Sequence, residues 1–88
     1  MAEYRLLVKA SAAKEEIEAL GTKADRQKVI ERIQALGADP RAEGSEKLAG
    51  YTDRYRVRQG QYRIIYLIDD RQHEITIFKV GHPKDVYR

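Results

Sequence analysis

Two alternating runs of apolar and charged residues constrain this chain more than any other feature. They form the stretch RYRVRQGQYRIIY, residues 54–66, with a Gln-Gly pair between them. Alternation with a period of two is typical of a β-strand with one buried face. Two such runs joined by two turn-forming residues predict an antiparallel hairpin. The stretch also carries several arginines, and like charges that face each other across a sheet are destabilising. Two questions follow: which residues pair across the two strands, and what offsets the repulsion between the arginines.

The register of the hairpin follows from matching its apolar faces. A two-residue loop at 59–60 places Val57 opposite Tyr62 and Tyr55 opposite Ile64, so both apolar sets lie on one face. A three-residue loop would shift the parity and bury arginine. In the second strand the even-numbered set is the more continuous one and is expected to face the helices: Tyr62, Ile64, Tyr66 and Ile68.

The same register sets Arg56 opposite Arg63, and Arg58 opposite Gln61, on the face away from the helices. Arginines on an exposed strand resist edge aggregation, which explains one or two of them. A directly opposed pair costs free energy unless an anion lies between its members. We therefore interpret the cluster as a site for a phosphate backbone, held by forked guanidinium donors.

The segments before the hairpin predict a short strand and a first helix. The apolar run EYRLLVK indicates a strand from about Tyr4 to Lys9. Ser11 then offers an N-cap oxygen, and apolar residues recur at helical spacing up to Gly21, which favours the left-handed conformation that ends a helix.

A second helix is expected to follow at once. Thr22 begins it, with Asp25 three residues on in the manner of a capping box, and Gly37 then Pro40 close it. The two helices have no chemistry of their own and are interpreted as scaffold.

The fold class predicted from these elements is α+β. Strands at 54–59, 61–68 and 74–80 with short loops favour a three-stranded antiparallel meander. A strand, a two-helix hairpin and this meander give two helices packed on one face of the sheet. Eighty-eight residues suffice for one domain, spanning residues 1–88, because a second would lack a core.

The composition excludes several classes of function. There is no Cys, so a disulfide framework, a thiolate metal site and a Cys nucleophile are ruled out, and no metal or cofactor is expected. No apolar run has the length of a bilayer span and no signal-peptide pattern is present, so we expect a cytoplasmic protein without a membrane partner.

The net charge of +3 is unevenly distributed along the chain. Residues 1–50 hold nine Lys/Arg and nine Asp/Glu, whereas residues 51–88 hold eight Lys/Arg and five Asp/Glu. A local basic excess indicates a polyanion or an acidic partner, although a solvated sheet face is an equal alternative on charge alone.

The C-terminal stretch GHPKDVYR adds groups that titrate or stack. His82 supplies an imidazole, Lys84 an ammonium and Tyr87 a phenol. If this tail lies against the arginine face, these are the parts for acid–base chemistry, charge stabilisation and base stacking in RNA cleavage.

The order of elements, with KLAGYTDRYRVRQGQYRIIYLI and a terminal KVGHPKDVYR, resembles the RelE family of the RelE/ParE toxin superfamily over nearly the whole chain. The resemblance implies a small endoribonuclease that cleaves mRNA in the ribosomal A site and inhibits translation. The RNA 2′-hydroxyl would attack the adjacent phosphate, giving a 2′,3′-cyclic phosphate and a free 5′-hydroxyl. The implied partners are mRNA on the ribosome and a cognate antitoxin, in a toxin–antitoxin hetero-oligomer.

The resemblance also implies roles for single residues. Arg56 and Arg58 would bind the scissile phosphate, Arg63 would stabilise the transition-state charge, Tyr87 would stack on or orient the base, and His82 is the acid–base candidate. The expected catalytic residues are thus Arg56, Arg63, His82 and Tyr87, and the expected RNA-binding residues are Arg54, Arg58, Lys84 and Arg88.

Two departures from the family pattern leave alternatives open. Pro83 stands where a basic residue often follows the histidine, so Lys84 must supply that charge. Arg56 and Arg58 stand where some relatives have lysine, and an arginine is a poor general base because it stays protonated. The alternatives are a ParE-like toxin that inhibits DNA gyrase and an RNA-binding relative that does not cleave.

Overall fold

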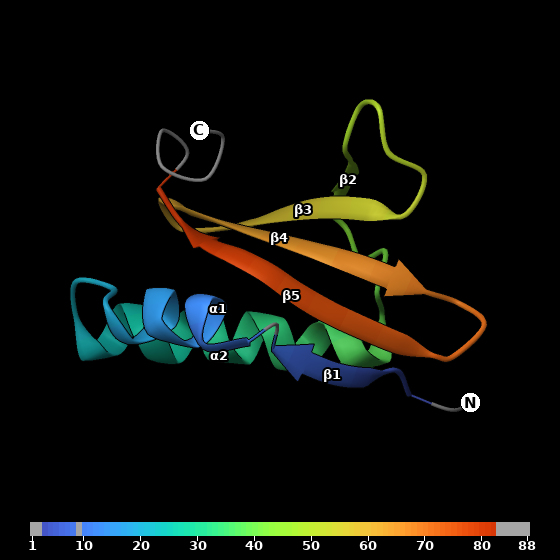
Figure 1. Cartoon of the computed structure of the whole chain (residues 1–88). Helices are drawn as coiled ribbons and strands as arrows, with labels where there is room; N and C mark the ends of the chain where they lie inside the picture. The colour runs from blue at the N-terminus through green and yellow to red at the C-terminus, as the bar shows by residue number, and fades with distance from the viewer. Residues whose placement is uncertain (1–2, 9, 83–88) are drawn as a thin grey trace.

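The computed structural model describes residues 3–8 and 10–82 and has two layers, two helices and one sheet (Figure 1). The helices are α1, Ala10–Glu18, and α2, Lys23–Ala38. The strands are listed in chain order: β1 Arg5–Val8, β2 Glu46–Lys47, β3 Arg54–Gln59, β4 Tyr62–Asp69 and β5 Glu74–Gly81. The predicted α+β class with both helices on one sheet face is confirmed.

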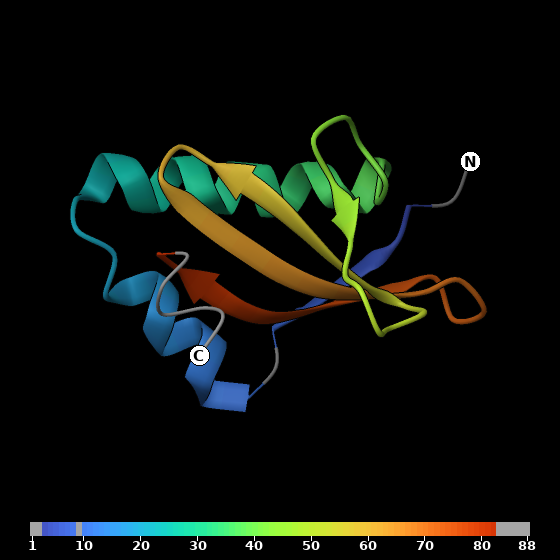
Figure 2. The same cartoon turned by 90° about the horizontal axis from the view of Figure 1, so that it is seen from above.

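The five strands form one sheet in the order β1-β5-β4-β3-β2. The meander β3-β4-β5 is antiparallel, as predicted, and β1 adds to its edge in parallel with β5. β2, which has only two residues, pairs with β3 at the other edge. Seen from above, α2 runs along one side of the strongly twisted sheet, and α1 lies near β5 (Figure 2).

The core lies between the helices and the inner face of the sheet. α2 contributes Val29, Ile33 and Leu36, which are buried as the helical spacing predicts. The even-numbered side chains of β4 are all buried against them, which confirms the predicted face. Leu20, just after α1, joins them, and the sheet supplies the other members of the cluster: Val57, Tyr62, Ile64, Tyr66, Ile68, Ile75, Ile77 and Val80.

The predicted start of α2 is confirmed, whereas the predicted start of α1 and both predicted helix ends are wrong. α1 ends at Glu18, and Gly21 does not take the left-handed conformation. Thr22 is the N-cap, and its side chain accepts a hydrogen bond from the backbone N–H of Asp25 (3.1 Å). α1 already includes Ala10, so Ser11 lies inside the helix instead of capping it. α2 continues through Gly37 to Ala38.

Gly37 is needed for packing, which explains why it does not end the helix. The backbone N–H of Tyr4 donates to the carbonyl of Gly37 (2.8 Å). A Cβ at Gly37 would lie 3.3 Å from the carbonyl oxygen of Tyr4, a tight contact with backbone. The missing side chain therefore lets the start of the chain cross close to α2.

The hairpin register differs by two residues from the prediction. The turn residues are Gly60 and Gln61, and Arg58 pairs with Arg63 while Arg56 pairs with Ile65. Gly60 has φ of +61°, the conformation that a type II′ turn requires at its first central position. The predicted loop would have put Gln59 there, which a side chain disfavours. Because the shift is by two residues, the inner and outer faces are unchanged.

Candidate functional site

Two arginines lie directly opposite each other on the outer face of the sheet, close to the hairpin turn. Arg58 on β3 is paired with Arg63 on β4. Arg56 lies two residues back on the same face of β3, so three guanidinium groups gather at one end of the sheet. They line a cleft of about 370 Å³ together with Gly44, Glu46 and Val57.

The short strand β2 brings a carboxylate into this cleft. Glu46 pairs with Arg56 in the sheet register, and its Oε2 accepts hydrogen bonds from Nη2 (2.6 Å) and Nε (3.2 Å) of Arg56. The hydrogen bond and the charge of Arg56 lower the pKa of Glu46, and the charge of Arg63 lowers it further. Glu46 is therefore ionised at neutral pH and faces cations.

Arg63 has an unsatisfied donor. Its Nη1 is buried and has no hydrogen-bond partner in the described part of the chain. Leaving a buried charged donor unpaired is costly, so native structures usually supply an acceptor. Arg32 has a buried nitrogen, Nε, in the same condition, so the unpaired donor alone does not identify a binding site.

The structure does not bring the His82 ring into this cleft. The residue follows Gly81, which is paired with Arg63. Its ring packs on the ring of Tyr62, with centroids 5.2 Å apart, and it borders a groove on the helix side with Glu16 and Asp25. The predicted residues Lys84, Tyr87 and Arg88, and also Pro83, lie outside the described residues.

Arg54 lies at the start of β3, on the same face of the strand as Arg56 and Arg58. Its guanidinium carbon lies 4.4 Å from the ring centroid of Tyr51 and 4.7 Å from that of Phe78. The described structure thus places Arg54, Arg56, Arg58 and Arg63 on one face. Sequence reasoning missed Glu46, since a strand of two residues has no periodicity to reveal it.

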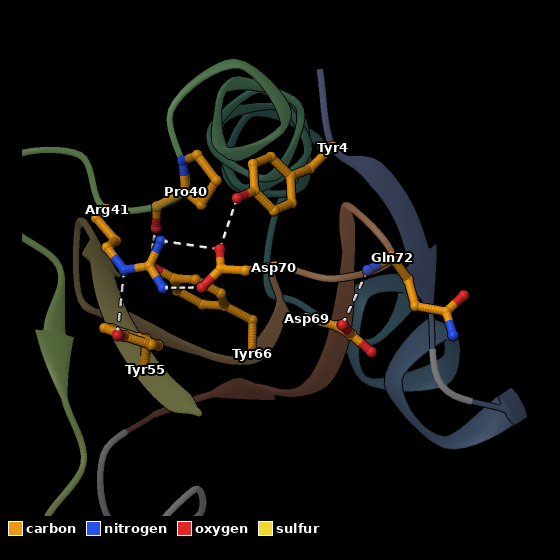
Figure 3. Close-up of polar contacts among 8 residues, drawn as sticks. All are labelled: Tyr4, Pro40, Arg41, Tyr55, Tyr66, Asp69, Asp70 and Gln72. Atoms are coloured by element: carbon orange, nitrogen blue, oxygen red, sulfur yellow. Dashed lines mark hydrogen bonds and ion pairs between the residues drawn. The ribbon is translucent and has the colours of Figure 1, made fainter. Parts of the chain in front are cut away.

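A polar network holds the segment that leads from α2 to β2 (Figure 3). Arg41 donates two hydrogen bonds to the carboxylate of Asp70, from Nη2 (2.8 Å) and from Nη1 (3.2 Å), and its Nε donates to the hydroxyl of Tyr55 (3.2 Å). Tyr4 donates its hydroxyl to the same carboxylate (2.6 Å), and Tyr66 donates to the carbonyl of Pro40 (2.8 Å). These contacts fix where β2 begins.

The network also shifts pKa values at its centre. Hydrogen bonds from Arg41 and from Tyr4 lower the pKa of Asp70. The hydrogen bond to Asp70 raises the pKa of Tyr4, and that of Arg41 is raised by the same carboxylate. All three groups therefore keep their charge state throughout the neutral range.

Within residues 3–8 and 10–82, no cluster of three or more His, Asp or Glu side chains has a geometry suited to a metal ion. None of the helices in these ranges has the length and apolar character needed to cross a bilayer.

Known proteins share both the sequence pattern and the fold. The toxin RelG of Mycobacterium tuberculosis is 41% identical over 34 residues, a match that spans 39% of each chain, so well under two thirds of that relative's length is covered. The RelE–RelB complex of Pyrococcus horikoshii OT3 matches with a TM-score of 0.79 and 27% identity, over 91% of this chain and 94% of the other.

A free E. coli toxin RelE with two arginine substitutions matches with a TM-score of 0.78 and 26% identity, over 99% of this chain and 92% of the other. Residues 7–87 match the family described as the ParE toxin of the type II toxin–antitoxin system parDE. The chain therefore belongs to this ParE toxin family and is a type II toxin of the RelE/ParE superfamily.

Proposed function

We propose that this toxin is an endoribonuclease that cleaves mRNA in the ribosomal A site. The observation that carries the proposal is the cleft lined by Arg56, Arg58 and Arg63, in which Arg58 and Arg63 are paired directly across the two strands. An RNA phosphate supplies the acceptors that this arrangement lacks. The likeness to solved RelE toxins over most of the chain is in keeping with this choice.

The proposed reaction is an internal transfer at the scissile phosphate. The 2′-hydroxyl attacks phosphorus, the bond to the 5′-oxygen breaks, and the products are a 2′,3′-cyclic phosphate and a 5′-hydroxyl. Negative charge accumulates on the nonbridging oxygens during the attack. Arg58 and Arg63 would stabilise this charge through their guanidinium donors, and Arg56 would contribute once it exchanges Glu46 for phosphate.

One proton must leave the 2′-hydroxyl and one must reach the 5′-oxygen. We propose Glu46, which is ionised in the cleft, as the acceptor of the first proton; its pairing with Arg56 lowers its pKa, so it becomes a stronger base only when Arg56 turns to the phosphate. We propose His82 as the donor of the second; it follows Gly81, the strand position paired with Arg63, and its ring, which lies on Tyr62, would have to turn towards the cleft to act. We retain Tyr87, Lys84 and Arg88 as proposed contacts to RNA.

The proposed partners are mRNA on the ribosome, in the cytoplasm, and a cognate antitoxin. The matched archaeal structure is a RelE–RelB complex. A cleft lined by three arginines attracts polyanions over distances of a Debye length. An antitoxin that covers it with acidic side chains would block RNA and form a hetero-oligomer with the toxin.

A ParE-like gyrase inhibitor is the second candidate, because the matching family carries the ParE description. The two functions separate in one paired experiment. Purified toxin is incubated with mRNA-programmed ribosomes, and the 5′ ends are mapped; the same preparation is assayed for inhibition of DNA gyrase supercoiling. Cleavage at A-site positions, absent with Arg63→Ala, supports the proposal. Gyrase inhibition without cleavage supports the ParE-like function, and RNA binding without either supports a non-cleaving relative.

A further inference from the structure

A second cluster of chemistry lies on the outer face of the sheet, beyond the arginine cleft. It consists of Tyr51, Arg54 and Phe78, and we call it the aromatic–arginine cluster. The loop that joins β2 to β3 and carries Tyr51 stands out from the sheet on the side away from the helices (Figure 1). The cluster therefore shares its face with Arg56, Arg58 and Arg63.

The guanidinium of Arg54 lies over both rings of the cluster, 4.4 Å from the centroid of Tyr51 and 4.7 Å from that of Phe78. Each contact is a cation–π interaction, which holds the rings and the charge in fixed positions. Phe78 is half-buried, whereas Tyr51 is 48% exposed. An exposed large aromatic ring held beside a cation offers a platform for another flat π-system.

The row of arginines sets the spacing between this platform and the cleft. Arg54, Arg56 and Arg58 alternate along β3, and alternate residues of a strand are about 6.7 Å apart. This step is comparable to the separation of phosphates in an extended single strand. A strand whose scissile phosphate lies at Arg58 and Arg63 would thus continue past Arg56 towards Arg54 and Tyr51.

We propose that Tyr51 and Arg54, supported by Phe78, form a subsite that stacks one nucleobase of the mRNA, flanking the cleaved phosphate. The inference rests on the proposed function and deepens it. Stacking on an aromatic ring with a neighbouring guanidinium is how single-stranded RNA is held without reading its sequence. The subsite therefore contributes to affinity for many mRNAs and leaves codon choice to other contacts.

The test couples a toxin variant to an mRNA variant. Cleavage by Tyr51→Ala and by wild type is measured under single-turnover conditions on ribosomes programmed with a series of mRNAs, each with one abasic nucleotide near the cleavage site. With intact mRNA, Tyr51→Ala should raise the half-saturating toxin concentration about 10-fold and leave the maximal rate within about 2-fold, as expected for loss of one base stack.

At one abasic position, the half-saturating concentration of wild type should rise by a similar factor. At that same position, the half-saturating concentration of Tyr51→Ala should not rise further. Tyr51→Phe retains the ring and should behave as wild type. Thr52→Ala, in the same exposed loop, is the matched control for loop packing.

Three results would contradict the proposed subsite. The first is a half-saturating concentration of Tyr51→Ala equal to that of wild type. If Tyr51→Ala weakens binding but every abasic position weakens the variant as much as it weakens wild type, Tyr51 contacts the ribosome itself and the proposed subsite is wrong. If wild type does not cleave at all, the proposed function fails and the subsite falls with it, whereas cleavage without coupling sinks the subsite alone.

Discussion

Glu46 and Arg56 face each other across the β2–β3 pair, with Oε2 of the carboxylate 2.6 Å from Nη2 of the guanidinium. The pair has two consequences for the proposed reaction. It keeps a proton acceptor ionised inside the arginine cleft, and it neutralises one of the cations that would otherwise bind phosphate. The same side chain therefore favours the chemical step and opposes binding.

Substitution Glu46→Gln separates these two effects. The amide retains the size of the side chain but neither accepts a proton nor repels phosphate. We expect the maximal cleavage rate to fall by about 10²-fold or more, as for loss of a general base. A 2′-deoxy analogue of the mRNA, which cannot be cleaved, should bind more tightly.

Stopped-flow binding and single-turnover cleavage on programmed ribosomes measure the binding affinity and the cleavage rate. Glu43→Gln, an exposed neighbour, is the control. A variant with full cleavage rate would show that the proton acceptor is another group.

Arg63→Ala tests the fixed positive charge. Its removal takes away a donor aimed at the developing negative charge, and the cleavage rate should fall by about 10²-fold or more. Arg63→Lys should recover only part of the loss, because an ammonium lacks the planar fork of guanidinium. Arg71→Ala, in the exposed turn before β5, controls for net charge. A far-UV circular dichroism spectrum and a thermal melt check that each variant is folded. Equal losses for Arg63→Ala and Arg71→Ala would mean that only overall charge matters.

His82→Gln tests the proposed proton donor. We expect a rate reduction comparable to that of Glu46→Gln, because an amide is not an acid that can protonate the leaving 5′-oxygen. Rates are measured from pH 5 to pH 9 with wild type in parallel. An unchanged rate and profile would move the donor role to Tyr87 or to water.

Asp70→Asn tests the network that positions β2, through the pH dependence of stability. The folded-state pKa of Asp70 is lowered by Arg41 and Tyr4, so its contribution to stability is present above its ordinary pKa of 3.8 and is lost as pH falls through the folded value. The variant should therefore melt at a lower temperature than wild type at pH 7, and the two melting temperatures should converge as the pH falls below about 3.8. Asp69→Asn, beside it, is the comparison. A difference that stays constant with pH would mean that the carboxylate charge is not what stabilises the turn.

The sequence predicted the faces of the sheet better than its register. Alternation alone placed Tyr62 and Ile64 inward and Arg63 outward, since a strand has only two faces. It could not choose between Arg56 and Arg58 as the partner of Arg63, because both registers bury the same residues. That choice is made by Gly60, which takes a positive φ.

Features of the site that depend on long-range contacts were invisible in the sequence. Glu46 reaches the cleft through its pairing with Arg56 on β3, and the segment before it is held by hydrogen bonds of Arg41 and Pro40 to Asp70 and Tyr66, which are distant in the chain. The cation–π contact of Arg54 with Phe78 likewise joins β3 to β5. Local patterns record neither, so these parts of the site were found only in the folded protein.

The last prediction concerns the buried hydroxyl that ties the core to this segment. Tyr66 is fully buried in the centre of β4, and its hydroxyl donates to the carbonyl of Pro40, at the exit of α2. Tyr66→Phe leaves the ring in place and deprives a buried carbonyl of its donor, which should cost about 1–3 kcal/mol in the free energy of unfolding. Tyr55→Phe, whose hydroxyl accepts from Arg41 at a more exposed position, should cost less. Because the carbonyl of Pro40 lies just before the segment that carries Glu46, Tyr66→Phe should also lower the cleavage rate under conditions where the variant is fully folded.

Urea denaturation measures the free energy of unfolding, and single-turnover cleavage measures the cleavage rate. A destabilised variant that cleaves at the wild-type rate would show that β2 keeps its place without this hydrogen bond.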